Sequence, residues 1–121
     1  MSILDQATKH FSDRVSASNM FIIEVDEWGD GSNSAQIHIK PETTADRERY
    51  MPAIMNNLPS GFVDLLICRC RTAGGTKLFK PADRDKLINN VDPKVIMKVA
   101  TEILRYDTDN NGEGLEEEKK D

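Results

Sequence analysis

The chain has 121 residues, of which 31% are charged and 38% hydrophobic, a size and composition typical of one globular domain. The net charge of −5 is uneven: residues 107–121 hold seven acids and two lysines, and the remaining residues hold 14 acids and 14 bases. A neutral body without a basic stripe argues against nucleic-acid binding. No apolar run approaches the ~20 residues of a membrane-spanning helix, and the N-terminus lacks a secretory pattern. We therefore expect no membrane association.

The first part of the chain predicts a helix followed by a β-hairpin. Apolar residues recur at helical spacing from Ser2 to Val15, which indicates a short amphipathic helix. Residues 20–25 are rich in β-branched and aromatic side chains, and residues 35–39 alternate apolar with polar ones, so each stretch predicts a strand. The turn residues between them favour an antiparallel hairpin. Because a lone hairpin is marginal in water, its apolar face must pack on helices.

Helical segments follow along the rest of the body. Thr44 is expected to cap the next helix. Residues 62–71 are predicted as a buried helix, although their length also suits a strand. Pro81 suits the first turn of a further helix, and Asp92 begins the last one, which has the cleanest amphipathic pattern in the chain. The predicted fold class is α+β, with an antiparallel β-hairpin packed against about four to five short α-helices in one compact domain over residues 1–106.

After Tyr106 apolar residues nearly vanish, which predicts a disordered acidic tail over residues 107–121. The same stretch fits the spacing of an EF-hand calcium loop, with oxygen-bearing residues at loop positions 1, 3, 5 and 12 and Gly112 at the sharp turn. Gly114 stands where an aliphatic residue usually pairs with a second loop, and the sequence contains no second loop. Calcium binding is therefore the weaker alternative. Its ligands would be Asp107, Asp109, Asn111 and Glu118.

Side chains for catalysis are not grouped in the sequence. No Ser-His-Asp or Cys-His grouping has local support, and the glycines form no phosphate-binding loop. Cys68 and Cys70 lie at a spacing that suits a disulfide poorly, and the histidines are too far away in sequence for a zinc site. We expect two packing residues or free thiols and a non-enzymatic protein without a cofactor. Trp28 is either a lid on the core, which we favour, or an exposed contact residue.

The order and pattern of these elements resemble the tail assembly chaperones of long-tailed bacteriophages. The resemblance covers roughly residues 20–106. It is carried by the strand running into EVDEWG at 24–29, the polar hairpin with its second strand, the threonine-initiated helix TTADRE at 43–48, an apolar helix, a glycine-containing loop before Leu78-Phe79, and final amphipathic helices that include ADRDKL at 82–87 and residues 95–104.

This resemblance implies a phage or prophage protein that acts in the cytoplasm of the bacterial host. Such chaperones coat the helical tape measure protein and keep it soluble before the tail tube polymerises around it. A frameshift-extended form recruits the tail tube protein, and the acidic tail lies where such an extension would begin. Self-association along the tape measure protein is expected. The alternatives are a single EF-hand-like calcium module and another phage structural part, such as a head–tail completion protein.

A chaperone for apolar helices needs an exposed apolar strip that a partner helix can contact. The body offers candidate side chains in its predicted helices and loops, and most of them must instead form the core. The sequence does not sort the two groups. The candidate partner-binding residues are Trp28, Phe62, Val63, Leu66, Leu78, Phe79, Ile96, Val99 and Ile103.

Overall fold

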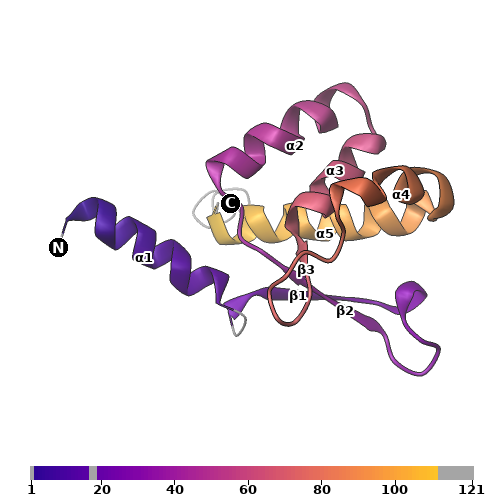
Figure 1. The fold of residues 1–121 in the computed structure, drawn as a ribbon, viewed down its shortest axis with the longest axis horizontal. Helices are drawn as coiled ribbons and strands as arrows, with labels where there is room; N and C mark the ends of the chain where they lie inside the picture. Colours follow the sequence, from indigo (N-terminus) through magenta and orange to yellow (C-terminus); the bar gives the residue numbers. More distant parts are fainter. Residues whose placement is uncertain (1, 17–18, 112–121) are drawn as a thin grey trace, which may run out of the picture.

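A computed structural model describes residues 2–16 and 19–111, and these form five α-helices and a three-stranded antiparallel sheet of order β1-β2-β3 (Figure 1). The α+β fold class predicted from the sequence is confirmed. In chain order the elements are α1 (Ile3–Val15), β1 (Phe21–Val25), the 3-10 turn η2 (Asp26–Trp28), β2 (Ala35–Ile39), α2 (Thr44–Asn56), α3 (Ser60–Arg69), β3 (Cys70–Arg71), the 3-10 turn η3 (Pro81–Asp83), α4 (Arg84–Asn90) and α5 (Pro93–Asn111).

The predicted hairpin is formed by β1 and β2, which pair antiparallel with Ile23 opposite Ile37. Both side chains point into the core, where they are 2% and 1% exposed. The turn between the strands is stabilised by hydrogen bonds among its own residues. The Asp30 carboxylate accepts hydrogen bonds from two backbone N–H groups of the turn, at 3.0 and 2.8 Å, and Gly31 adopts a φ of +95°, a conformation that favours glycine.

The central element of the body is α3, which packs against α2, α4 and α5. It is apolar on nearly all sides, as expected for a helix enclosed by others, and Leu65 and Leu66 are fully buried. The helices α2 and α3 approach very closely at Gly61. A Cβ atom at this position would lie 2.5 Å from the backbone carbonyl of Ala53, so only glycine fits. Below α3, the long helix α5 also contacts β1 (Figure 1).

The helix predicted over residues 62–71 is shorter than expected at its C-terminal end. The last helical residue of α3 is Arg69, and Cys70 takes an extended backbone with φ −77° and ψ 134°. Cys70 then pairs with Ile39 of β2 and adds a third strand to the hairpin. The short apolar run therefore contains both a helix and a strand, the two structures between which its length could not decide.

The N-terminal cap of α2 lies one residue before the predicted Thr44. The hydroxyl of Thr43 accepts a hydrogen bond from the backbone N–H of Asp46, and the Asp46 carboxylate accepts one from the N–H of Thr43, both at 3.0 Å. This reciprocal arrangement is a capping box, and it satisfies two backbone donors that a helix start would otherwise leave unpaired.

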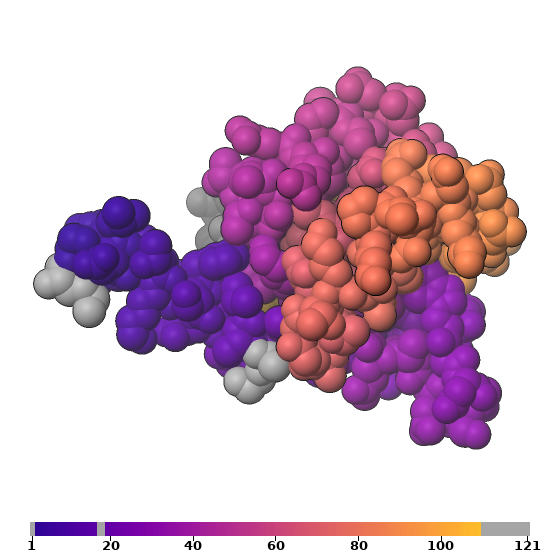
Figure 2. Space-filling view, in the orientation of Figure 1, coloured from indigo at the N-terminus to yellow at the C-terminus, as the bar shows by residue number. Residues whose placement is uncertain are grey.

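The predicted amphipathic helix at the N-terminus is confirmed as α1, but none of its residues is buried. It projects from one end of the body as a separate arm (Figures 1 and 2). Ile3 and Leu4 at its tip are 79% and 72% exposed. At its root, the ammonium group of Lys40 lies 5.3 Å from the ring centre of Phe11, a cation–π contact with the body.

The predicted boundary between an ordered body and a disordered tail is corrected for the first tail residues. Instead of ending at Tyr106, α5 continues to Asn111. Asp107 is only 6% exposed, because it pairs with the buried Arg69. The rest of the predicted tail, residues 112–121, lies outside the described residues.

Candidate functional site

Two adjoining apolar pockets flank α4, at the end of the body opposite α1 (Figure 1). The pocket on the hairpin side, called here the hairpin pocket, has a volume of about 330 Å³. The pocket on the side of the α2–α3 turn, called the turn pocket, has a volume of about 260 Å³. Leu87 and Val91 line both pockets, so the two adjoin on either side of α4, and together they are called the α4 groove. In Figure 2 the orange α4 lies between the pink α2–α3 turn and the purple hairpin.

An aromatic pair forms one wall of the hairpin pocket. Trp28 comes from η2 at the end of β1, and Phe79 comes from the segment after β3. Their rings meet edge to face, with centroids 6.1 Å apart and an interplanar angle of 85°, a favourable geometry for aromatic side chains. The backbone N–H of Leu78 donates to the carbonyl of Cys70 at 3.1 Å, which holds this segment beside the sheet. Trp28 is half-buried and packs against the core, as a core lid would, and it also lines the hairpin pocket.

The turn pocket has a buried floor and an exposed rim. Val63 of α3 and Ile96 of α5 form the floor and are each 3% exposed. Leu58 and Ile88 stand at the rim and are 59% and 39% exposed. Among the described residues no charged side chain lines either pocket, and the α4 groove is lined mainly by apolar side chains.

The structure brings together five of the nine predicted partner-binding residues in the α4 groove. Three of the others are fully buried and belong to the core. Phe62 is half-buried against the core and lines neither pocket. The groove residues are Trp28, Val63, Leu78, Phe79 and Ile96, and the core residues are Leu66, Val99 and Ile103.

Several groove residues were missed from the sequence, among them four large apolar side chains outside the sheet. Leu58 precedes Pro59 in a segment read only as a helix end, and the other three lie on α4 and just after it. The sequence contained one signal for these residues, the adjacent apolar pair Leu87-Ile88 in α4. Neighbouring side chains on a helix point in different directions, so both cannot be buried in the same core. These four apolar residues are Leu58, Leu87, Ile88 and Val91.

A second cluster, buried and polar, surrounds Arg69 at the end of α3. The guanidinium of Arg69 is 0% exposed and donates two parallel hydrogen bonds to the Asp107 carboxylate, each 2.8 Å long. Its Nε–H donates to the carbonyl of Lys40 at 2.6 Å, and the Glu42 carboxylate lies 3.6 Å away. Glu42 in turn accepts a hydrogen bond from the Tyr50 hydroxyl. Because these groups satisfy one another, the cluster is a structural tie between α2, α3 and α5.

The pKa shifts in this cluster agree with a closed network. Burial alone would lower the pKa of Arg69, but the hydrogen bonds and charge of Asp107 raise it. Burial and the hydrogen bond to Glu42 both raise the pKa of the Tyr50 hydroxyl. Both groups are therefore held in the forms they have at neutral pH, and neither is prepared for proton transfer.

The calcium ligands predicted from the sequence do not form a loop in the described part of the chain. Asp107 and Asp109 lie within α5, where residues two apart point in different directions. Both carboxylate oxygens of Asp107 accept hydrogen bonds from Arg69. Asn111 ends the helix, and Glu118 lies outside the described residues. Over residues 2–16 and 19–111 no group of three or more His, Cys, Asp or Glu side chains is placed to hold a metal ion.

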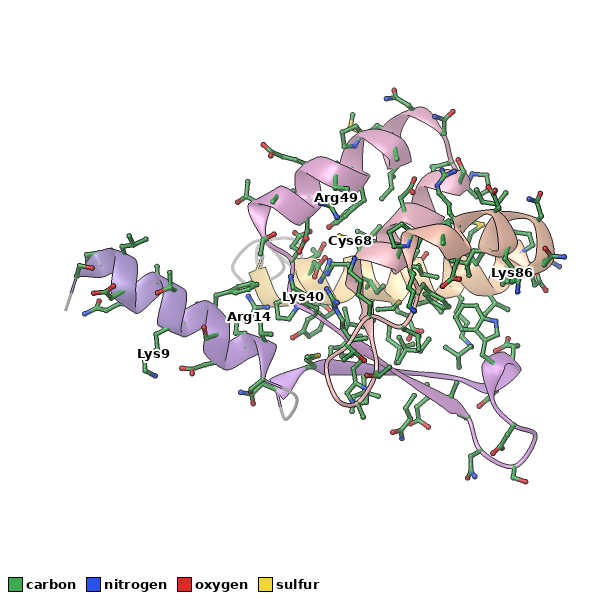
Figure 3. The ribbon with its side chains drawn as sticks, in the orientation of Figure 1. Lys9, Arg14, Lys40, Arg49, Cys68 and Lys86 are labelled. Atoms are coloured by element: carbon green, nitrogen blue, oxygen red, sulfur yellow. The ribbon has the colours of Figure 1, made fainter. Side chains whose placement is uncertain are left out.

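The two cysteines are free and buried, as predicted. Cys68 lies close to Lys40 and Arg49 (Figure 3). Burial raises the pKa of its thiol, and the carboxylate of Asp46 raises it further. Burial also raises the pKa of Cys70, to about 12. Both thiols therefore stay protonated at neutral pH and are poor nucleophiles.

No family model, curated protein or solved structure matches this chain. Within the described residues, every helix is too short or too polar to cross a membrane. The α4 groove combines a buried apolar floor at Val63 and Ile96 with an exposed apolar rim at Leu58 and Ile88.

Proposed function

We propose that this chain is a tail assembly chaperone that binds a helix of the tape measure protein in the α4 groove. The observation that carries the proposal is the groove itself, a charge-free apolar surface with an exposed rim at Leu58, Leu78 and Ile88. Such a surface suits an amphipathic helix, which inserts apolar side chains spaced three, four or seven residues apart. The resemblance in element order supplies the identity of the client.

The proposal explains why the groove has two pockets rather than one. A client helix places successive apolar anchors along one face, and two adjoining pockets with the shared walls Leu87 and Val91 can take consecutive anchors. The half-buried pair of Trp28 and Phe79 supplies large, rigid contact area of the kind that dominates binding energies. Covering these side chains would protect both the chaperone and a sparingly soluble client from aggregation.

In this proposal the protein is non-enzymatic, needs no cofactor, and acts in the cytoplasm of the bacterial host. Several copies bind along one tape measure protein and give way to tail tube subunits when the tube polymerises. A frameshift-extended form would recruit the tail tube protein beyond the end of α5, whose last residue, Asn111, precedes the acidic stretch.

Co-expression with the tape measure protein tests the proposal. We expect a complex that co-purifies and a soluble tape measure protein. Substituting Leu78→Asp, at a position that is 36% exposed on the groove rim, should abolish the complex. The matched control Met97→Asp, 46% exposed on α5 and outside the groove, should leave it intact. No complex with the unaltered chain, and no gain in client solubility, would overturn the proposal.

The only tryptophan reports directly on the groove. When a client helix covers the hairpin pocket, emission from Trp28 should shift to shorter wavelength, and acrylamide should quench it less. If a complex forms while the emission and quenching of Trp28 stay unchanged, the client binds elsewhere on the body.

A further inference from the structure

We propose that α1 of one copy of this chain docks into the α4 groove of a second copy. Two features left unpaired in the isolated chain carry this inference. The helix α1 has an apolar face but buries no residue, and the α4 groove has apolar walls that face water. Each is the kind of surface that the other would cover.

The arm α1 is a helix that its own body does not hold along its length. A helix of this length is marginal in water without tertiary contacts. Its root is fixed by the contact of Phe11 with Lys40, whereas Ile3 and Leu4 at the tip are 79% and 72% exposed. Lys9 extends from the polar face into solvent (Figure 3). The apolar tip is therefore presented outward, ready to contact another surface.

Charge favours α1 over the acidic end of the sequence as the occupant of the groove. Within residues 2–16 and 19–111 no charged side chain lines the groove, so an occupant must present an uncharged face to avoid burying an unpaired charge. The tip of α1 offers Ile3, Leu4 and Ala7 on one face. Residues 112–121 instead carry five acids and two lysines, with Leu115 as their only large apolar residue. The α1 tip fits the groove, and the acidic segment does not.

The arm and the groove lie at opposite ends of the body (Figure 1). The contact of Phe11 with Lys40 lies at the arm's end of the body, and the tip of α1 points away from its own groove (Figure 1). It can reach the groove of a neighbour. Such a contact joins two different surfaces, so copies can continue head to tail or close into a dimer by exchanging their arms.

One short helix tip buries less surface than the ~1,200 Å² at which stable interfaces begin. The contact is therefore expected to be weak, reversible and dependent on concentration. The docking itself does not require the proposed function. If that function holds, a tape measure helix competes with α1 for the same groove. In the absence of a client the groove would be covered by α1 of a neighbouring copy, and a bound client would displace that helix.

Sedimentation of the full chain over a range of concentrations tests the inference. We expect the average mass to rise with concentration for the unaltered chain. Leu4→Asp should weaken self-association by about 10- to 100-fold, the effect of losing one buried leucine from the contact. The control Gln6→Asp adds the same charge to the polar face of α1 and should associate as the unaltered chain does.

A groove variant completes the design. Ile88→Asp should also give a monomer, and Met97→Asp should not. Circular dichroism and thermal unfolding confirm that each variant is folded; if Ile88→Asp unfolds, Leu58→Asp at the more exposed rim position takes its place.

Mixing the two defective chains gives the decisive result. The Ile88→Asp chain keeps its arm and the Leu4→Asp chain keeps its groove, so an equimolar mixture should form a one-to-one dimer that cannot grow further. A monomeric unaltered chain at all concentrations, unimpaired association of Leu4→Asp, or a mixture that stays monomeric would each overturn the inference. None of these measurements contains the tape measure protein, so failure here and failure of the proposed function are distinguishable.

Discussion

Replacing Asp107 with asparagine should strongly destabilise the fold, although Asp107 lies near the end of the last described helix. The change keeps the shape of the side chain and removes the charge that faces the fully buried Arg69. Removing one partner of a buried pair costs about 3–5 kcal/mol, because the other charge is left uncompensated. Glu42 remains 3.6 Å from the guanidinium as a second anion, so we expect the lower end, about 3 kcal/mol.

Urea and thermal unfolding followed by circular dichroism would measure this loss. A decrease of about 3 kcal/mol corresponds to a fall in Tm of about 12 °C or more for a domain of this size. The control is Asp109→Asn, two residues further along α5 and exposed, which should change the free energy of unfolding by less than about 0.5 kcal/mol.

A loss below about 1 kcal/mol for Asp107→Asn would refute the reasoning, because the Arg69 network would then contribute little to the fold. Adding calcium to the unaltered chain gives an independent check. If Asp107 is committed to Arg69, millimolar calcium should leave Tm unchanged, whereas a calcium loop that uses Asp107 should raise it by mass action.

Three further predictions concern single positions. Burial alone would raise the pKa of Asp46, but hydrogen bonds from Lys40 and a backbone N–H lower it to about 2. The ionised carboxylate therefore stabilises the fold fully above its ordinary pKa of 3.8, and this stabilisation is lost as the pH falls toward 2. In Asp46→Asn, the free energy of unfolding should accordingly depend less on pH in this acid range. With the pKa of Cys70 raised to about 12 and both thiols buried, a thiol reagent should titrate neither cysteine until the chain is unfolded in denaturant. Gly61→Ala should lower the free energy of unfolding, measured in urea, by about 3 kcal/mol, because the new Cβ meets rigid backbone of α2 at 2.5 Å. The control Gly74→Ala should change it little, because the nearest atom to its new Cβ would be 3.9 Å away.

Local features of the fold could be predicted because local chemistry determines them. The hairpin follows from two β-rich stretches around a turn that contains Gly31, and the start of α5 follows from the Asp92-Pro93 pair. The errors at Thr44 and over residues 62–71 are of one or two positions. They arise where a neighbouring residue, Thr43 or Cys70, competes for the same cap or end.

Features that depend on contacts between distant residues could not be predicted. The sequence after Tyr106 is polar, and polarity indicated disorder, but a single long-range pair with Arg69 extends α5 past this point. Helical periodicity likewise identified the apolar face of α5 without showing that Ile103 is enclosed while Ile96 reaches a pocket. The helix α1 shows the converse. Its amphipathic pattern correctly predicted a helix, but the burial that usually accompanies such a pattern is absent.

The order of the elements explains why one apolar helix is enclosed and another is left free. The body closes around α3, and the Arg69 network ties α3 to the last turns of α5, so the N-terminal helix is not needed to complete the core. Ile3 and Leu4 at its tip, 79% and 72% exposed, contribute little to the stability of the isolated chain. An apolar face that the fold does not use exposes a protein to aggregation, and it can persist without that cost only if something covers it. The α4 groove at the opposite end of the body has the uncharged lining to do so.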